Sequence, residues 1–132
     1  MPIRLAVLAT ALLFASGVPA HAQTAPAAAA DVADGKLAYY GQRFAGRRTA
    51  SGERFNPQAL TMAHKTLPFG TLVRVTNPAN QRSVVVRVND RGPTAADRVG
   101  DVSLAAARQL RMTRAGVVQA KLEVVGSAKR KA

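Results

Sequence analysis

The segment from Ser83 to Pro93 constrains the fold of this chain more than any other part of the sequence. Residues 83–88, Ser-Val-Val-Val-Arg-Val, are rich in β-branched side chains and predict a buried strand. Asn89 and Asp90 follow, and residues 91–93, Arg-Gly-Pro, have the composition of a turn. A carboxylic acid at the end of an apolar strand is partly desolvated yet accessible to a substrate. The pattern indicates a β fold with a chemically usable acid at a strand end.

Three further segments have the composition and alternation of strands, namely residues 36–41, 70–76 and 116–125. The Asn-Pro-Ala-Asn sequence at 77–80 favours a turn that joins two of the strands into a hairpin. We therefore expect a small, mostly β domain. A closed barrel would bury its core without leaving exposed strand edges.

One helix is predicted after residue 103. Leu104, Ala107 and Leu110 fall on one helical face, and either Asp101 or Ser103 is placed to cap the first turn. A second, short helical turn is expected within residues 57–64. The predicted fold therefore contains one or two short helices beside its strands.

The first 22 residues have the pattern of a secretory signal peptide. A short basic start precedes an apolar run too short to span a bilayer, and Ala20-His21-Ala22 matches a cleavage site before Gln23. We expect a periplasmic or secreted protein. Residues 23–34 are rich in alanine and predict a flexible lead, residues 35–125 the folded domain, and residues 126–132 a basic, disordered tail.

The chain carries a formal net charge of +12 and contains no cysteine. Cationic proteins often bind nucleic acid, but an exported protein rarely meets it, so we expect no nucleic-acid partner and favour anionic cell-wall or envelope partners. Solvated arginines on strand faces are the simpler alternative. Without cysteine, disulfides and a lipoprotein anchor are excluded, and no membrane anchor is expected.

Glu53, His64 and Asp90 are the candidate catalytic residues. Glu53 and Asp90 are the carboxylates whose sequence context suggests no other role, and His64 is the one histidine after the predicted cleavage site. Alternatives remain open: Asp90 as a turn former, Glu53 as a solvated loop acid and His64 as a core residue. No short ligand pair such as His-x-x-x-His is present, so neither a metal nor another cofactor is expected. A serine or cysteine nucleophile is also disfavoured, because the chain lacks cysteine and a Gly-x-Ser-x-Gly motif.

Several motifs in the same order resemble the rare lipoprotein A family. They are Tyr39–Gly41, Gly46–Glu53, Leu60–Thr71 and Val88–Pro93, followed by Arg98–Ser103 and Ala105–Ala107. The resemblance covers roughly residues 35–125. It implies a six-stranded double-psi β-barrel, related to the expansins and to a membrane-bound lytic transglycosylase.

In that family, the positions matching Glu53, His64 and Asp90 are associated with lytic transglycosylase activity on peptidoglycan strands that lack stem peptides. The resemblance implies that a carboxylic acid protonates the oxygen between N-acetylmuramic acid and N-acetylglucosamine, and that the 6-hydroxyl of the former closes a 1,6-anhydro ring. We favour Asp90 as this acid, but the sequence does not fix which of Asp90 and Glu53 donates the proton. Glu53 would hold the sugar and favour the protonated form of Asp90 by like-charge repulsion. His64 would orient the carboxylates or bind a sugar hydroxyl.

Tyr40, Arg91 and Ser51 are the expected substrate-binding residues. Tyr39 and Tyr40 alternate on one strand, so one of them is expected to face out and stack on a sugar. Arg91 would clamp a substrate carboxylate if the chain turns after Asp90. We expect a monomer whose partner is the peptidoglycan glycan strand.

The sequence departs from the family pattern in three places. Ala38 replaces a frequent serine, Met62 stands where a small residue is usual, and Gly100-Asp101-Val102 replaces a more apolar version. None of these removes a proposed catalytic group. The alternative function is an expansin-like module that binds wall glycan without cutting it, since one fold supports several activities.

Overall fold

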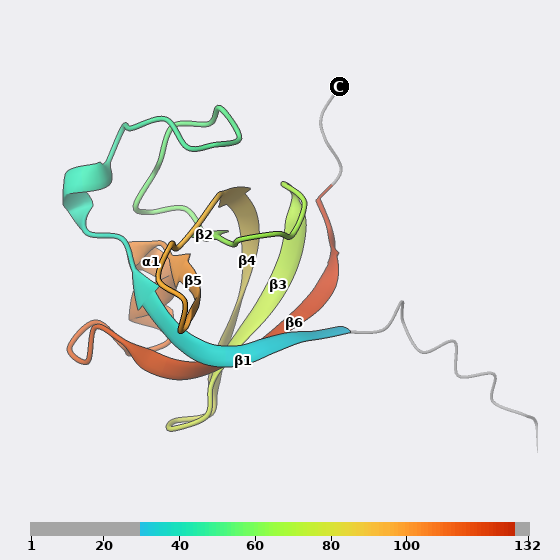
Figure 1. The fold of residues 1–132 in the computed structure, drawn as a ribbon. Coiled ribbons are helices and arrows are strands. Elements are labelled where there is room, and N and C mark those ends of the chain that lie inside the picture. The colour runs from blue at the N-terminus through green and yellow to red at the C-terminus, as the bar shows by residue number, and fades with distance from the viewer. Residues whose placement is uncertain (1–29, 129–132) are drawn as a thin grey trace, which may run out of the picture.

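The computed structural model describes residues 30–128, which form a closed six-stranded barrel (Figure 1). The strand order around the barrel is β1-β5-β2-β4-β3-β6. The expected mostly β barrel with one or two short helices is thereby confirmed. The strands are β1 (Ala30–Tyr39), β2 (Thr61–Ala63), β3 (Thr71–Asn77), β4 (Arg82–Asp90), β5 (Arg98–Val102) and β6 (Val118–Ser127), and the helices are the 3₁₀ helix η1 (Gln42–Phe44) and α1 (Leu104–Gln109).

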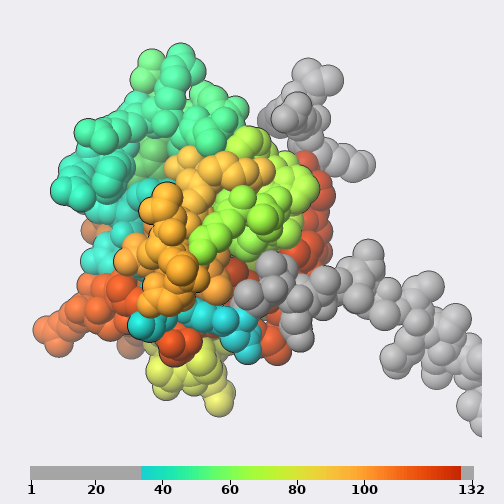
Figure 2. All heavy atoms as spheres, in the orientation of Figure 1, coloured from blue at the N-terminus to red at the C-terminus, as the bar shows by residue number. Residues whose placement is uncertain are grey.

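Two strand pairs are parallel, β1 with β5 and β2 with β4, and the other neighbours run antiparallel. Parallel neighbours need crossover connections, and here β1 and β5 are joined through β2, β3 and β4, whereas β2 and β4 are joined through β3. β1 and β2 are separated by β5 in the barrel, and the loop that connects them, residues 40–60, stands out as a lobe on one side (Figure 2). The topology therefore places this loop beside the ends of strands that are distant in sequence.

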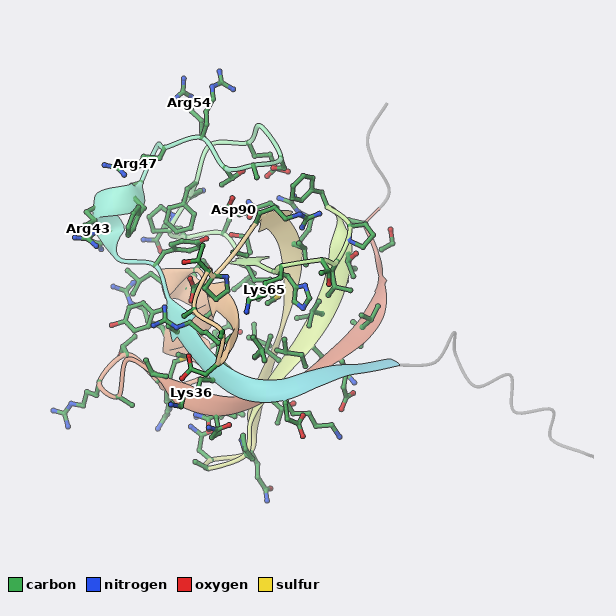
Figure 3. All side chains as sticks on the ribbon, in the orientation of Figure 1. Lys36, Arg43, Arg47, Arg54, Lys65 and Asp90 are labelled. Atoms are coloured by element: carbon green, nitrogen blue, oxygen red, sulfur yellow. The ribbon has the colours of Figure 1, made fainter. Side chains whose placement is uncertain are left out.

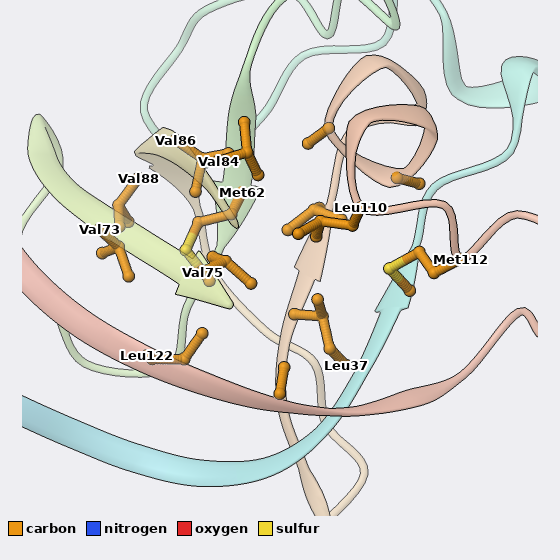
Figure 4. Packing of buried hydrophobic residues seen from close by; sticks show 14 residues of the cluster. Leu37, Met62, Val73, Val75, Val84, Val86, Val88, Leu110, Met112 and Leu122 are labelled. Atoms are coloured by element: carbon orange, nitrogen blue, oxygen red, sulfur yellow. The ribbon is translucent and has the colours of Figure 1, made fainter. Parts of the chain in front are cut away.

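The core fills the barrel with alternating apolar residues. Along β3, Val73 and Val75 are fully buried, while Arg74 between them is exposed. Leu110 and Met112, which follow α1, pack onto the same cluster (Figure 4). Because β-branched residues pack well on a pleated surface, the valine-rich strands suit this interior.

The helix begins as predicted but with one of its two possible caps. The Ser103 side chain accepts a hydrogen bond from the Ala106 N–H and caps α1. Asp101, the other candidate cap, lies instead within β5. Ser103 suits this role because it lies three residues before Ala106, whose N–H is free in the first turn.

The helical turn expected within 57–64 is wrong for its second half, where Thr61–Ala63 forms β2. β2 pairs with β4 on one side and with β5 on the other. Its three residues are all buried, so the segment shows no alternation that could have marked it as a strand. Pairing on both sides outweighs the weak local preference of so short a segment.

The paired strands extend beyond the expected domain limits at both ends. β1 begins at Ala30, before Gly35, because its first residues pair with β6, and β6 continues past Val125 to Ser127. The predicted signal peptide, most of the predicted lead and the end of the basic tail lie outside the described residues. Within residues 30–128, no helix is both long and apolar enough to cross a membrane.

Two departures from the family pattern occupy the same space in the core. A Cβ atom at Gly100 would lie 2.5 Å from the Met62 Cε, 3.2 Å from the Ala63 carbonyl oxygen and 3.5 Å from the Leu37 Cδ1. The larger side chain at 62 therefore fills volume that a side chain at 100 would otherwise occupy. Interiors are close-packed, so these two positions are expected to be energetically coupled.

Candidate active site

A β-bulge decides where the Asp90 carboxylate points. Met62 of β2 pairs with Val88, whereas the next residue, Ala63, pairs with Asp90, so Asn89 is an extra residue in β4. Strict alternation would return Asp90 to the face of the buried Val88, inside the barrel. The bulge aligns Asp90 with Ala63 instead, on the outer face, because paired residues on adjacent strands share a face.

Three hydrogen bonds hold the Asp90 carboxylate within the described part of the chain. Its Oδ1 accepts from the backbone N–H groups of Ala50 and Arg91, both at 2.9 Å. Its Oδ2 accepts from the Tyr40 hydroxyl, also at 2.9 Å. The carboxylate is therefore fixed in orientation, and Oδ2 is the less saturated of its two oxygens.

The Ala50 donor comes from a hairpin, residues 46–55, whose two arms are joined by backbone hydrogen bonds. At its tip, the Ser51 N–H donates to the Asn89 carbonyl at 3.2 Å. The Ser51 hydroxyl is hydrogen-bonded to that of Thr49 and accepts from the Glu53 N–H. In this structure Ser51 therefore stabilises the tip that is docked on Asp90.

Tyr40 links the acid to a small aromatic cluster. Its ring contacts those of Phe44 and Phe55, with centroids 5.6 and 5.1 Å away. Burial raises the pKa of Tyr40, and the hydrogen bond to Asp90 raises it further, so the hydroxyl remains a donor. The preceding Tyr39 packs on the core and donates to the Thr113 carbonyl, as strand alternation requires.

Glu53 is paired with an arginine of β4. The Arg87 guanidinium donates to both carboxylate oxygens, at 2.5 and 2.8 Å. This hydrogen bonding holds the pKa of Glu53 below its ordinary range, against a smaller opposing effect of partial burial. Arg87 and Asp90 are separated by about 10 Å of strand. The structure thus gives Glu53 a counter-ion, which weakens the like-charge repulsion expected to act on Asp90.

His64 connects to the same strand end through its backbone, whose N–H donates to the Asp90 carbonyl at 3.2 Å. Its imidazole is buried, and Nδ1 accepts from the N–H groups of Thr66 and Leu67, at 3.1 and 3.0 Å. Burial lowers the pKa of His64, and the positive charges of Arg91 and Lys65 lower it further. The neutral ring therefore acts as an internal cap for the loop after β2.

Arg91 stabilises that same loop. Its guanidinium donates to the carbonyls of His64 and Leu67, at 3.2 and 2.7 Å, and lies 4.1 Å from the centroid of the Phe69 ring. Both hydrogen bonds use Nη1, so this end of the guanidinium is engaged by the protein's own loop. In this structure Arg91 orders residues 64–69 beside the site.

The imidazole interactions predict how stability depends on pH. Because the folded pKa of His64 lies below its unfolded value of about 6.5, stability from the neutral ring is complete above that pH. It is lost as the pH falls through the folded pKa, at about 1.4 kcal/mol for each unit of pKa lowering. His64→Asn keeps an acceptor for the loop but does not titrate.

Urea unfolding of both proteins between pH 7.5 and 5 checks this expectation. The free energy of unfolding of the wild type should fall relative to that of His64→Asn as the solution becomes more acidic. Parallel curves for the two proteins across this range would show that the His64 cap does not titrate in the folded state.

Asp101 is a carboxylate that the sequence interpretation misplaced. Ala63 pairs with Asp90 on one side and with Asp101 on the other, so both acids lie on the outer face, about 10 Å apart between Cα atoms. The Asp101 Oδ1 is buried without a hydrogen bond, 3.5 Å from the Arg98 guanidinium. Burial raises the pKa of Asp101, Arg98 opposes this rise, and the charge of Asp90 adds to it.

A pocket of about 240 Å³ opens beside Asp90. Tyr40, Phe44 and Phe55 form an aromatic part of its lining. Arg47, Arg48 and Thr49 form a polar part, and Asp90 also lines the pocket. Figure 3 shows Asp90 at the end of β4, with Arg43 and Arg47 farther out on the 40–60 loop. The pocket combines an acid, ring faces and cations, which suits a sugar that carries a negative charge.

The structure therefore brings the segments of all three predicted catalytic residues to the end of β4. Their side chains are engaged differently: Asp90 lines the pocket, Glu53 binds Arg87, and the His64 ring binds its own loop. Sequence interpretation missed the arginines at 47 and 48. The available sequence signal was the pair of adjacent arginines that follows Phe44 in a segment bounded by Gly46 and Gly52. Among the described residues, no group of three or more metal-ligating side chains is present.

Residues 32–122 match the model of a protein family described as "Lytic transglycolase". Three curated relatives bear a common name. The "Probable endolytic peptidoglycan transglycosylase RlpA" of Nostoc sp. is 58% identical over 70% of this chain. The "Endolytic peptidoglycan transglycosylase RlpA" proteins of Neisseria meningitidis and Campylobacter jejuni are 50% and 48% identical over 69% and 75% of it. The resemblance to the rare lipoprotein A family is thereby confirmed.

The matched region spans only 25%, 38% and 36% of the lengths of these three relatives. Among solved structures, a Streptomyces papain inhibitor is similar to this chain, with a TM-score of 0.57 and 25% sequence identity. The alignment covers 72% of this chain and 96% of the inhibitor. The same barrel therefore occurs in a protein named as an inhibitor and in proteins named as transglycosylases, so activity has to be inferred from the site rather than from the fold.

Proposed function

The chain belongs to the lytic transglycolase family, and from this premise we propose that it is an endolytic lytic transglycosylase that cleaves the glycan strands of peptidoglycan. The observation that carries the proposal is the Asp90 carboxylate, held by backbone and tyrosine donors at the edge of an aromatic pocket. The names of the relatives support the substrate class.

In the proposed reaction, protonated Asp90 donates its proton to the oxygen between C1 of N-acetylmuramic acid and C4 of N-acetylglucosamine. The C1–O bond breaks, and the 6-hydroxyl oxygen of the muramic sugar forms a bond to C1. The proton of that hydroxyl then passes to the Asp90 carboxylate, which restores the acid. No water is consumed, and the product ends in a 1,6-anhydro ring.

The hydrogen bonds of Asp90 suit this double role. Oδ1 is held by two backbone N–H groups, so Oδ2 is the oxygen that carries the proton. Tyr40 donates to Oδ2 when the carboxylate is ionised and lines the pocket in which the sugar would lie. A sugar ring bound against the half-buried Tyr40 ring would present its linking oxygen to Oδ2.

The finer features of the proposal are a preference for strands without stem peptides and action in the periplasm after removal of the leader. The test uses the full chain, purified sacculi, and sacculi pretreated with an amidase. We expect soluble fragments with 1,6-anhydro ends, identified by mass spectrometry, and more of them after amidase treatment. Binding to sacculi without any new chain ends would contradict the proposal and favour the expansin-like module.

We expect Glu53 to help position Asp90 through its ion pair with Arg87, and a charge swap tests this role. Glu53→Gln removes an ion pair that joins the hairpin to β4, and we expect activity to fall about tenfold because Ala50 no longer holds Asp90 firmly. The pair is partly exposed, so the loss of stability should remain below about 1 kcal/mol. Restored kcat in Glu53→Arg/Arg87→Glu would establish positioning, whereas an inactive swap would indicate direct contact of Glu53 with substrate.

A further inference from the structure

The cationic side of the pocket is not explained by the cleavage step. Arg47 lines the pocket and lies 5.4 Å from the centroid of the Phe44 ring. Among residues 30–128 it makes no ion pair, since the nearby acids are engaged elsewhere: Glu53 with Arg87, and Asp90 with Tyr40 and backbone donors. An arginine without an anionic partner, beside the reactive acid, is available for an anionic group of the ligand.

Local contacts hold both arginines of the pocket in place. Arg47 stacks on Phe44, which restricts the orientation of its planar guanidinium. The Arg48 Nη1 donates to the Gly52 carbonyl at 3.0 Å, which leaves its other N–H groups available. A guanidinium fixed in this way loses less conformational entropy when it binds a carboxylate.

The proposed substrate offers a carboxylate at the corresponding place. The muramic sugar whose C1 is attacked carries a lactyl ether on the same ring, and this group ends in a carboxyl. That carboxyl is a free anion when no stem peptide is attached, and it becomes a neutral amide when one is. With the ring beside Asp90, a substituent of the same sugar lies within the dimensions of a pocket of about 240 Å³.

We propose that Arg47 and Arg48 form a subsite that binds the free lactyl carboxylate of the sugar being cleaved. This inference rests on the proposed function and explains its preference for strands without stem peptides. Attachment of a peptide removes the negative charge and adds bulk at the subsite. The enzyme would therefore distinguish strands without stem peptides from strands that carry them by the lactyl group of the sugar whose bond is cut.

Stem peptides carry carboxylates of their own, so substrates must separate the two sources. Three are compared: strands with intact peptides, amidase-treated strands, and amidase-treated strands whose lactyl carboxylates are converted to methylamides. The methylamide keeps nearly the shape of the free acid but loses its charge. We expect the amidase-treated strands to be cleaved at least tenfold faster than the other two.

Arg47→Gln is expected to lower the rate on amidase-treated strands about tenfold and to lower the rate on methylamidated strands much less, because those strands offer the subsite no carboxylate. Arg43→Gln is the matched control. It removes the same charge from a residue stacked on the same Phe44 ring, at 4.9 Å, but Arg43 does not line the pocket. It should behave as the wild type on all three substrates at 150 mM salt.

Equal rates of the wild type on free-acid and methylamidated strands would overturn the subsite. Equal losses in Arg43→Gln and Arg47→Gln would also overturn it, because they would reveal general attraction by the cationic surface. Fastest cleavage of peptide-bearing strands would assign the arginines to peptide carboxylates instead.

Binding separates this inference from the proposed function. Fluorescence anisotropy with labelled oligomers, measured on the Asp90→Asn background, reports affinity without cleavage. Tighter binding of the free acid that is lost in Arg47→Gln supports the subsite, even if the wild type yields no anhydro product. Equal affinity for the free acid and the methylamide contradicts the subsite while leaving cleavage as a separate result.

Discussion

Replacing Asp90 with asparagine is expected to reduce the rate of anhydro-product formation by a factor of about 10² to 10⁴. The amide retains an oxygen that accepts from the Ala50 N–H, so the hairpin should remain docked. It cannot deliver a proton to the glycosidic oxygen or take one from the 6-hydroxyl. The measurement is the initial rate of release of anhydro-ended fragments from amidase-treated glycan.

Asp97→Asn is the control for this prediction. Asp97 is exposed, pairs with Lys36 and does not line the pocket, so its replacement removes a carboxylate charge without touching the site. Its activity should equal that of the wild type. Thermal unfolding of both variants establishes that they are folded. An Asp90→Asn protein that retains more than a tenth of the wild-type rate would exclude Asp90 as the proton donor.

The largest expected effect on stability comes from the contact between Gly100 and Met62. Met62→Ala leaves a cavity in the barrel and should cost about 2–5 kcal/mol. Gly100→Val places methyl groups where the Met62 Cε lies and should cost about 1–3 kcal/mol through overpacking. In the double variant the new side chain fills part of the cavity, so the combined cost should be smaller than the sum by about 0.5–3 kcal/mol.

Urea unfolding of the wild type, the two single variants and the double variant measures this coupling. Gly35→Val is a useful comparison, because its Cβ would meet Val99 rather than Met62. Its effect should add to that of Met62→Ala without coupling. Strict additivity of the Gly100 and Met62 substitutions would show that the two departures from the family pattern do not compensate for each other.

The elements predicted correctly are those with a strong local pattern. β3 and β4 carry alternating or β-branched residues over seven and nine positions, and α1 has a serine cap before its apolar face. β2 was missed because three buried residues have no period to detect. Asp101 was assigned to a cap for a related reason: β5 contains glycine, and its strand character depends on pairing with β1 and β2.

The candidate site likewise contains features that local sequence predicts and features that depend on the tertiary structure. The position of Asp90 at a strand end follows from the turn residues after it, and the structure confirms that β4 ends there. The roles expected for Arg91 and His64 depend on where the chain goes next. The loop after β2 folds back on itself, so the Arg91 guanidinium binds its carbonyls and the His64 ring binds its N–H groups. The family resemblance pointed to the candidate segments but not to the partners of each side chain.

The sequence by itself determined that this chain forms a small β domain, which strands are central to it, and that Asp90 ends one of them. Those features depend on the alternation and turn preferences of neighbouring residues, which act over a few positions. Only the tertiary structure decided that the Asn89 bulge turns Asp90 outward and that Arg47, Tyr40 and Asp90 border one pocket. These features depend on register and on crossovers between distant strands, and neither is recorded in any local pattern.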